Sequence, residues 1–190
     1  MLFTATTSRK KIWEIVTKEL HLASKDPHHP FRFVNFCTLN GGQPDSRYVV
    51  LRETTEDLKL LFFSDSRSEK IAQVRTNPSI SLLFYHPSER CQVKINGVAT
   101  ILPQKEANEN FWNKIPSEAQ KAYQSKWPPK THVDTLEKGI MLESKYKNDY
   151  FSVIQIFPME VECLQLDSKG HLRIVFKRAH AKWQSSWLVP

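Results

Sequence analysis

The sequence has 190 residues, a length that suits one domain with a single sizeable core or a domain with a helical annex. Its 40% hydrophobic and 25% charged residues are typical of globular proteins, and the absence of any run of about 18 apolar residues excludes a transmembrane helix. The net charge of +7 could serve nucleic acid or an anionic ligand, but the lysines and arginines are spread along the chain, which favours a solvated basic surface.

Cysteine and histidine usage argues against disulfides and metal sites. The cysteines Cys37, Cys91 and Cys163 are odd in number and form no CxxC pair, so we expect a reducing compartment. The histidines show no HExxH or similar ligand spacing, so we expect no metal site. The segment Met1–Thr4 lacks the charged region and long apolar region of a secretory signal. We therefore expect a cytoplasmic protein that binds no membrane.

The first predicted element is a helix over about residues 8–24. Ile12, Val16 and Leu20 recur at helical spacing after Ser8, which is a suitable N-cap. The helix should end before Pro27, because the residue before a proline is pushed out of the helical region.

The middle of the chain predicts short strands separated by turns. Aromatic and β-branched residues favour strands over residues 31–39, 47–53, 58–63, 80–85 and 92–101. We expect a loop at Gly41–Asp45, a short helix over residues 66–75 that Asn77-Pro78 ends, and a bend at Asn96-Gly97. Because these strands are too close in sequence for helical crossovers, they should pair antiparallel.

The last part of the chain predicts a helical annex and a second group of strands. The annex covers about residues 104–126, and strands are expected over residues 151–166, 171–177 and 182–189. Seven or eight short antiparallel strands with few peripheral helices predict a mainly β fold, in one domain over residues 1–190. A closed or nearly closed barrel removes exposed strand edges and is favoured over a sandwich, which is the alternative.

The most informative stretch for function lies between residues 47 and 97. An apolar strand after Arg47 could lie along a flat ring, and its backbone groups could bond the polar edge of that ring. Arg47 and Lys70 can satisfy a phosphate, and the helix predicted to start near Lys70 adds amides that favour an anion. Gln92 offers a donor and an acceptor to a heteroaromatic edge. Spacing alone does not separate this arrangement from an ordinary strand and an ordinary helix start.

The order of the motifs in this stretch is more specific. An Arg-x-Val-x-Leu-Arg strand at residues 47–52 is followed by an aromatic–Ser pair, a Ser-x-Lys helix start, Asn-Pro, Phe-Tyr and a Gln-Val-Lys strand that ends at Gly97. This series resembles the pyridoxamine 5′-phosphate oxidase family and its FMN-binding split-barrel relatives. A weaker resemblance continues through residues 142–145, 158–162 and 171–173 to the end of the chain.

The resemblance implies an antiparallel split β-barrel that works as a homodimer, with FMN at the interface of the two subunits. It implies that Arg47 and Lys70 bind the FMN phosphate, and that Phe63 and Ser64 contact the ring or the ribityl-phosphate region. Gln92 should contact the flavin from its own strand. The complete set of implied cofactor contacts is Arg47, Tyr48, Val49, Val50, Leu51, Arg52, Phe63, Ser64, Arg67, Ser68, Lys70 and Gln92.

Three positions depart from the family at its substrate site. The family holds the phosphate of its substrate with Tyr, Arg and Ser, where this sequence has Phe111, Ile115 and Ala119. None of the three can supply the same charge or hydroxyl group. The pyridoxal-phosphate site is therefore predicted to be dismantled, while the FMN phosphate site is mostly kept.

Smaller departures surround the cofactor positions. Cys91 replaces the arginine of the family's Arg-Gln pair, and Glu69 replaces a basic residue that often precedes the helix lysine. Arg67 could substitute for that basic residue. Leu164 falls where the family has a flavin-stacking tryptophan. Trp183 or Trp187 could replace that ring, with core or dimer packing as the alternative for both.

Three residues are candidates for substrate contact. Trp112 falls in the region that would cover the flavin, with packing of the annex as the alternative. His171 and Arg173 match a substrate-side His-Arg pair of the family.

The resemblance thus implies an FMN-dependent oxidoreductase that acts on a small organic substrate other than pyridoxine or pyridoxamine phosphate. The flavin carries the redox chemistry, so no catalytic acid or base is assigned. One alternative is a binding module of the same fold that holds flavin, or haem with His86 or His171 as axial ligand. Nucleic-acid binding through the basic surface is a third hypothesis, without a matching motif.

Overall fold

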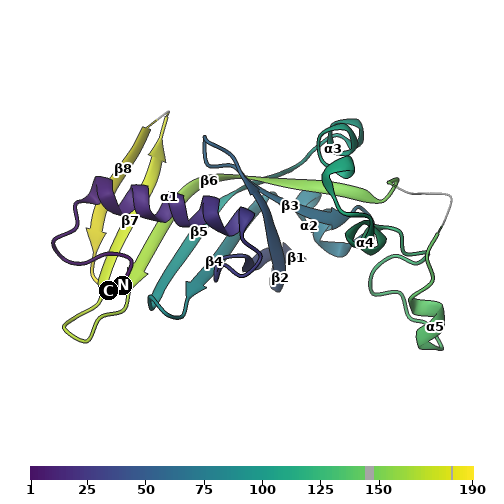
Figure 1. Ribbon diagram of the computed structural model, residues 1–190, viewed down its shortest axis with the longest axis horizontal. Helices are drawn as coiled ribbons and strands as arrows, with labels where there is room; N and C mark the ends of the chain where they lie inside the picture. The colour runs from purple at the N-terminus through teal and green to yellow at the C-terminus, as the bar shows by residue number, and fades with distance from the viewer. Residues whose placement is uncertain (144–147, 181) are drawn as a thin grey trace.

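The computed structural model describes residues 1–143, 148–180 and 182–190 (Figure 1). Ser144 and Lys145, which belong to the weaker part of the predicted resemblance, lie outside the described residues. The strands within the described residues are β1 (Phe33–Asn40), β2 (Gln43–Thr54), β3 (Leu60–Asp65), β4 (Ser79–His86), β5 (Cys91–Ile101), β6 (Phe151–Gln165), β7 (Leu172–Ala179) and β8 (Lys182–Leu188). The α-helices are α1 (Arg9–Lys25), α2 (Glu69–Thr76), α3 (Gln104–Asn110), α4 (Ser117–Gln120) and α5 (Leu136–Gly139).

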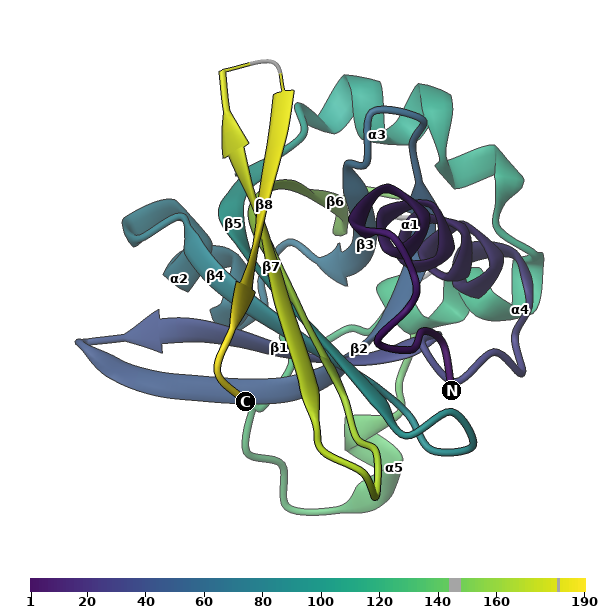
Figure 2. The same cartoon turned by 90° about the vertical axis from the view of Figure 1, so that its left-hand side faces the viewer.

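The strands form one antiparallel sheet that closes on itself. Their order is β3-β2-β1-β4-β5-β6-β7-β8, and β3 pairs a second time, with β6, so that the first six strands form a ring. Residues 151–156 of β6 pair with β3, whereas residues 160–165 pair with β7, and Pro158 lies between the two halves. Figures 1 and 2 show β7 and β8 leaving the ring as an extension. The predicted mainly β, antiparallel fold with few helices is confirmed and is consistent with a split barrel.

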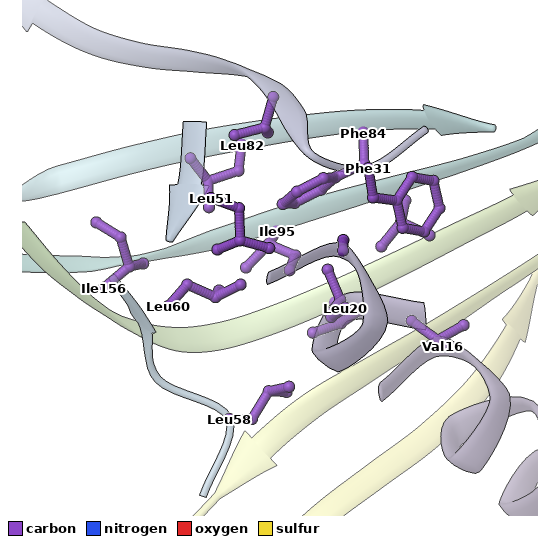
Figure 3. Close-up of a cluster of buried hydrophobic side chains, with 14 of the residues drawn as sticks. Val16, Leu20, Phe31, Leu51, Leu58, Leu60, Leu82, Phe84, Ile95 and Ile156 are labelled. Carbon is purple, nitrogen blue, oxygen red and sulfur yellow. The ribbon is translucent and has the colours of Figure 1, made fainter. Parts of the chain in front are cut away.

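Helix α1 packs its apolar face against the interior of the ring. Ser8 caps the helix by accepting a hydrogen bond from the Lys11 amide at 3.2 Å, and the chain leaves the helical conformation at Asp26, as predicted. Val16 and Leu20 are fully buried beside the inward side chains of the strands (Figure 3). Each such aliphatic side chain contributes about 1.5–3 kcal/mol to stability, so α1 is anchored to the ring rather than held by its own propensity.

A second, smaller core lies on the opposite side of β3 and β6. Successive residues of a strand point to opposite faces, so Leu60 enters the first core and Leu61 the second. The annex covers this second face, where the rings of Trp112 and Phe151 lie 5.4 Å apart and those of Tyr123 and Phe151 lie 5.2 Å apart. The two cores fix β3, and with it the entry into α2, from both sides.

Several predicted boundaries differ from the structure, and the helix expected over residues 66–75 spans Glu69–Thr76. The loop expected at Gly41–Asp45 is only the two-residue turn Gly41-Gly42, and β2 already begins at Gln43. Both glycines have positive φ, 57° and 84°, which is the geometry of a tight hairpin turn, and Asn40 pairs directly with Gln43. In the annex, the expected helical stretch consists of short pieces, α3 and α4 with 3₁₀ turns at Trp112–Lys114 and Lys121–Tyr123.

Within the described residues, none of the helices is long and apolar enough to cross a membrane.

The register of β5 shifts between Asn96 and Gly97, where the backbone of β6 comes very close. A methyl group on Gly97 would lie 2.5 Å from the carbonyl oxygen of Phe157, a distance that real side chains do not reach. The bend predicted at Asn96-Gly97 is therefore this bulge, and its glycine is required by the close approach of the backbone.

We expect Gly97→Ala to lower the free energy of unfolding by about 2 kcal/mol, because either β5 or β6 must move to admit the methyl group. Denaturant titration measures this loss. Gly139→Ala is the matched control, since its new methyl group meets a side-chain atom of Val133 at 3.3 Å, and we expect a change below about 0.5 kcal/mol. Equal losses in both variants would contradict the close approach.

Candidate functional site

Arg47 and Lys70, far apart in sequence, line one cavity of about 230 Å³. Arg47 projects from β2, opposite Phe36 of β1, and Lys70 is the second residue of α2. The complete lining is Asp45, Ser46, Arg47, Ser68, Glu69, Lys70, Pro129 and Lys130. Strand β2 and the start of α2 thus bring together the two cations that the sequence predicts to bind a phosphate.

Hydrogen bonds hold the Arg47 guanidinium in a fixed position. Its Nη1 donates to Thr38 Oγ1 at 2.5 Å, and its Nη2 donates to Gln73 Oε1 at 3.1 Å and pairs with Asp45 Oδ2 at 2.5 Å. Gln73 also donates to Asp45, and this bond, together with the nearby Arg47 charge, lowers the pKa of the Asp45 carboxyl. Arg47 is therefore oriented by its neighbours before any ligand arrives.

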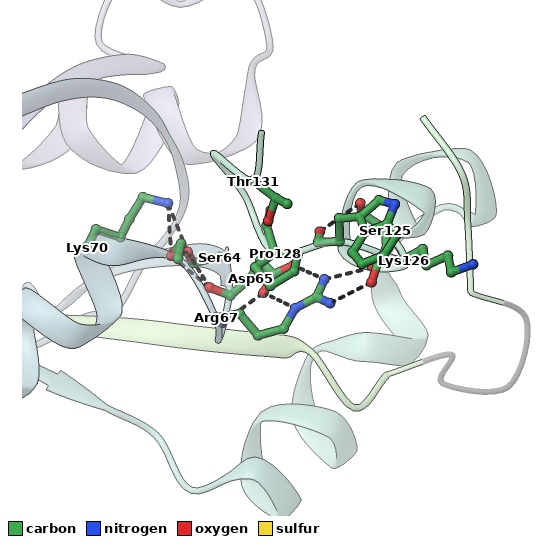
Figure 4. Close-up of polar contacts among 10 residues, drawn as sticks. Ser64, Asp65, Arg67, Lys70, Ser125, Lys126, Pro128 and Thr131 are labelled. Atoms are coloured by element: carbon green, nitrogen blue, oxygen red, sulfur yellow. Dashed lines mark hydrogen bonds and ion pairs between the residues drawn. The ribbon is translucent and has the colours of Figure 1, made fainter. Parts of the chain in front are cut away.

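Lys70 lies in a partly desolvated position beside Arg47. Its Nζ donates to Ser64 Oγ at 3.0 Å and to Ser68 Oγ at 3.3 Å (Figure 4). Burial lowers the pKa of Lys70, the Arg47 charge lowers it further, and Asp65 opposes this shift. Two positive groups held close together favour an anion between them, and the first turn of α2 adds a favourable dipole.

Ser64 and Ser68, predicted to contact the cofactor, lie beneath Lys70. Their side chains are 3% and 5% exposed, and their hydroxyl groups are 3.0 Å apart. Ser68 Oγ donates to the carbonyl oxygen of Asp65 at 2.7 Å. In this structure the two hydroxyl groups position the Lys70 ammonium, and direct contact with a cofactor stays a prediction.

Arg67 faces away from this cavity. Its Nη2 lies 2.7 Å from Asp65 Oδ2 and donates to the Ser125 carbonyl at 2.8 Å (Figure 4). Its guanidinium carbon lies 3.5 Å from the centre of the Tyr150 ring. It therefore joins the end of β3 to the annex and the approach to β6. The residue that lies beside Glu69 in the described structure is Lys130 and not Arg67.

The remaining predicted residues of β2 alternate between the two faces of the strand. Tyr48 is 74% exposed on the outer face, whereas the Leu51 side chain is fully buried inside the ring. Val49 packs against the edge of the core, and Val50 is half-buried. Leu51 could reach a cofactor only through its backbone.

A second cavity, of about 310 Å³, contains all three positions that depart from the family's substrate site. Its lining is Arg32, Arg52, Glu53, Phe63, Phe111, Lys114, Ile115, Pro116 and Ala119. The Arg52 guanidinium carbon lies 5.6 Å from the centre of the Phe63 ring, and Lys114 Nζ lies 5.5 Å from that of Phe111. The cavity combines aromatic walls with positive charge, although its substituted positions are apolar.

Arg32 and Lys114 are cations of the second cavity that the sequence did not single out. Arg32 Nη1 donates to the carbonyl oxygens of Ala23 and Ser24 at 3.2 and 2.7 Å, so it caps the C-terminal end of α1. Desolvation, followed by the nearby Arg52 charge, lowers the pKa of Arg32. Neither residue belongs to a motif, and only the folding of α1 and the annex towards β2 brings them to Arg52.

Gln92 lies in neither cavity lining. It sits on the outer face of the sheet, in a row of paired residues that runs Tyr85, Gln92, Leu164 and Arg173 across β4 to β7. The structure therefore places Gln92 and Arg173 on the same face, two strands apart, and Gln92 outside the lining of the Arg47 cavity of its own chain.

In both His171 and His86, one ring nitrogen accepts a hydrogen bond from a backbone amide close in sequence. The Nδ1 of His171 accepts from the Asp167 amide at 3.3 Å in the β6–β7 hairpin, and that of His86 accepts from the Glu89 amide at 3.2 Å. Arg173 Nε lies 3.8 Å from Glu162 Oε1. These roles are structural, and contact with a substrate or haem stays a prediction.

Trp112, Cys91 and Trp183 have packing roles in this structure. Trp112 is 7% exposed in the second core, and Trp183 stacks on Trp13 with ring centres 4.5 Å apart. Cys91 is fully buried in the first core, where desolvation raises the pKa of its thiol to about 12. These positions agree with the packing alternatives given for Trp112 and Trp183, and contact of Trp112 with a substrate stays a prediction.

Comparison with known proteins agrees with this fold. A Nostoc punctiforme protein related to pyridoxamine 5′-phosphate oxidase, and described as FMN-binding, superposes with a TM-score of 0.78 at 19% identity over 97% of this chain and 100% of its own. PhzG from Burkholderia lata, solved with tetrahydrophenazine-1-carboxylic acid, has a TM-score of 0.75 at 18% identity over 98% of this chain and 95% of its own.

Sequence comparison identifies the family. The model described as pyridoxamine 5′-phosphate oxidase matches residues 25–137, more than half of the chain. Pyridoxine/pyridoxamine 5′-phosphate oxidases of Leptospira interrogans and Zymomonas mobilis are 26% and 28% identical, over 83% and 77% of this chain and 79% and 81% of theirs. The chain belongs to the pyridoxamine 5′-phosphate oxidase family.

We expect Arg67 to stabilise the fold rather than to bind a ligand in the cavity of Arg47 and Lys70. Arg67→Ala leaves the carboxylate of Asp65, which is 6% exposed, without its ion partner, and should lower the free energy of unfolding by about 3 kcal/mol. Chemical denaturation measures the loss. The double variant Asp65→Asn, Arg67→Met removes both charges and should recover much of it, whereas a double variant as unstable as the single one would contradict this role.

Proposed function

We propose that the chain is an FMN-binding oxidoreductase that works as a homodimer on a small organic substrate other than pyridoxine or pyridoxamine phosphate. The observation that carries this proposal is the convergence of Arg47 and Lys70 in one cavity at the start of α2. The family of the chain and the FMN-binding description of its Nostoc neighbour support the choice of cofactor.

The cavity of Arg47 and Lys70 fits a phosphate group. Arginine presents a planar fork of donors and lysine a compact charge, and both form charge-assisted hydrogen bonds with phosphate oxygens. An anion between the two cations would relieve the Arg47 repulsion that, after burial, lowers the pKa of Lys70 in the free protein. The bound flavin would supply the redox chemistry, while these side chains hold and orient its tail.

The outer face of the sheet supports the homodimer. Four large side chains on β1, β2 and β4 are 40–74% exposed on this face: Phe33, Tyr48, Leu83 and Tyr85. Asn35 pairs with both Tyr48 and Leu83, so the exposed residues form neighbouring rows rather than scattered points. A contiguous apolar surface of this kind is typical of an interface. A second copy would bring its own Gln92 row to the flavin.

The second cavity suggests the chemistry of the substrate. Arg52 and Lys114 supply positive charge beside the rings of Phe63 and Phe111, and with Arg32 they outnumber the one carboxylate of this lining, Glu53. These groups suit a planar ring that carries a carboxylate, and PhzG was solved with a molecule of this kind. Without the hydroxyl groups of the family's phosphate clamp, the cavity is less suited to a phosphate ester.

Removal of both cations tests the cofactor site. We expect Arg47→Ala combined with Lys70→Ala to weaken FMN binding by about 100-fold or more, because each charge-assisted hydrogen bond contributes about 1.5–3 kcal/mol. Quenching of flavin fluorescence measures the dissociation constant. Riboflavin, which has no phosphate, should lose far less affinity. Unchanged FMN affinity in a folded variant would contradict the proposal.

The depressed pKa of Lys70 predicts how binding depends on pH. Binding needs the charged ammonium, and a bound anion raises the pKa that burial and Arg47 lower in the free protein. FMN affinity should therefore be complete below the free-state pKa and fall as pH rises through it, in titrations from about pH 7 to about pH 10. Lys70→Arg keeps its charge over this range and should remove the decline. A decline that persists in this variant would assign the titration to another group.

A further inference from the structure

Lys130 enters the cavity of Arg47 and Lys70 from a distant part of the chain. It follows the Trp127-Pro128-Pro129 stretch, between the annex and α5, and its Nζ forms an ion pair with the carboxylate of Glu69. Both Pro129 and Lys130 line the cavity. The loop that carries them therefore forms one wall of the predicted phosphate site.

The backbone at Lys130 adopts a conformation that lysine rarely takes. Its φ is +70°, and the amide of Thr131 donates to the carbonyl oxygen of Pro128 at 3.2 Å, which closes a tight turn with Pro129 and Lys130 at its centre. Glycine is the usual residue at such a position of positive φ. A strained residue persists where its surroundings fix it, and such residues gather at ligand sites.

The charges that line the cavity indicate a role for Lys130 in anion binding. Five charged side chains line it, the cations Arg47, Lys70 and Lys130 and the carboxylates Asp45 and Glu69. Without Lys130, two cations would face two carboxylates, and the cavity would have no net positive charge. With Lys130 the balance is three against two, so this loop residue makes the cavity attractive to an anion.

We propose that Lys130 is a third phosphate-binding residue, which Glu69 holds at the cavity in the free protein and which turns to the phosphate when the ligand binds. This inference rests on the proposed function, since it assumes that the FMN phosphate occupies the cavity of Arg47 and Lys70. The ion pair with Glu69 raises the pKa of Lys130 and keeps it charged. Glu69 is a positioning residue that competes with the phosphate for Lys130.

Two variants that break the same ion pair should have opposite effects. Lys130→Gly removes a cation from the cavity and suits the positive φ, so the fold is preserved and FMN should bind about tenfold more weakly. Glu69→Gln removes the competing carboxylate and should tighten FMN binding by about two- to threefold. If the ion pair only fastened the loop, both variants would weaken binding. Effects of the same sign, or none for Lys130→Gly, would overturn the proposal.

Controls separate this proposal from the proposed function. Lys138→Ala removes a lysine of α5 that pairs with Asp134 outside the cavity lining, and should leave FMN affinity unchanged. Riboflavin affinity should stay the same in the Lys130→Gly and Glu69→Gln variants, because neither residue acts on the ring. If the wild-type chain fails to bind FMN, the proposed function fails, and inorganic phosphate then serves as the probe. Phosphate binding followed by NMR should weaken in Lys130→Gly and strengthen in Glu69→Gln, and equal shifts would overturn the role of Lys130.

Discussion

Two positive side chains that are held close together in a partly desolvated cavity raise the free energy of a protein until an anion lies between them. Arg47 and Lys70 are held in this way: the guanidinium by Thr38, Gln73 and Asp45, and the ammonium by two buried serine hydroxyl groups. Asp45 offsets part of the Arg47 charge, yet burial, followed by the Arg47 charge, still lowers the pKa of Lys70. The cavity is therefore organised for an anionic group, and the account of this protein as a flavin enzyme depends on that constraint.

The fold holds Arg47 and Lys70 in place because the two faces of its strands pack against different partners. The inner face of the ring, together with α1, forms the first core, while the annex covers the outside of β3 and β6. Because both faces of β3 are packed, the start of α2 that follows it is held beside β2, and Lys70 and Arg47 line the same cavity. The outer face of β1, β2 and β4 is left with large exposed side chains, and a second subunit would bury them.

The sequence predicted most helices and strands because aromatic and β-branched residues mark the strands, and glycine and proline mark the turns between them. It also predicted the meeting of Arg47 and Lys70, through the ordered motifs of one continuous stretch. It could not predict that Arg67 turns to Asp65 while Lys130 takes the place beside Glu69, because that choice depends on where a distant loop folds. The same limit applies to Arg32 and Lys114, which reach the second cavity from the end of α1 and from the annex. Local patterns give strands and helix starts, whereas contacts between separate segments need the assembled core.

A crystal structure of the protein grown with FMN tests the central claim most directly. The account predicts that the phosphate oxygens lie within hydrogen-bond distance of Arg47 Nη and Lys70 Nζ, next to the first turn of α2. A flavin bound with its phosphate elsewhere, while Arg47 and Lys70 keep only their protein partners, would contradict it.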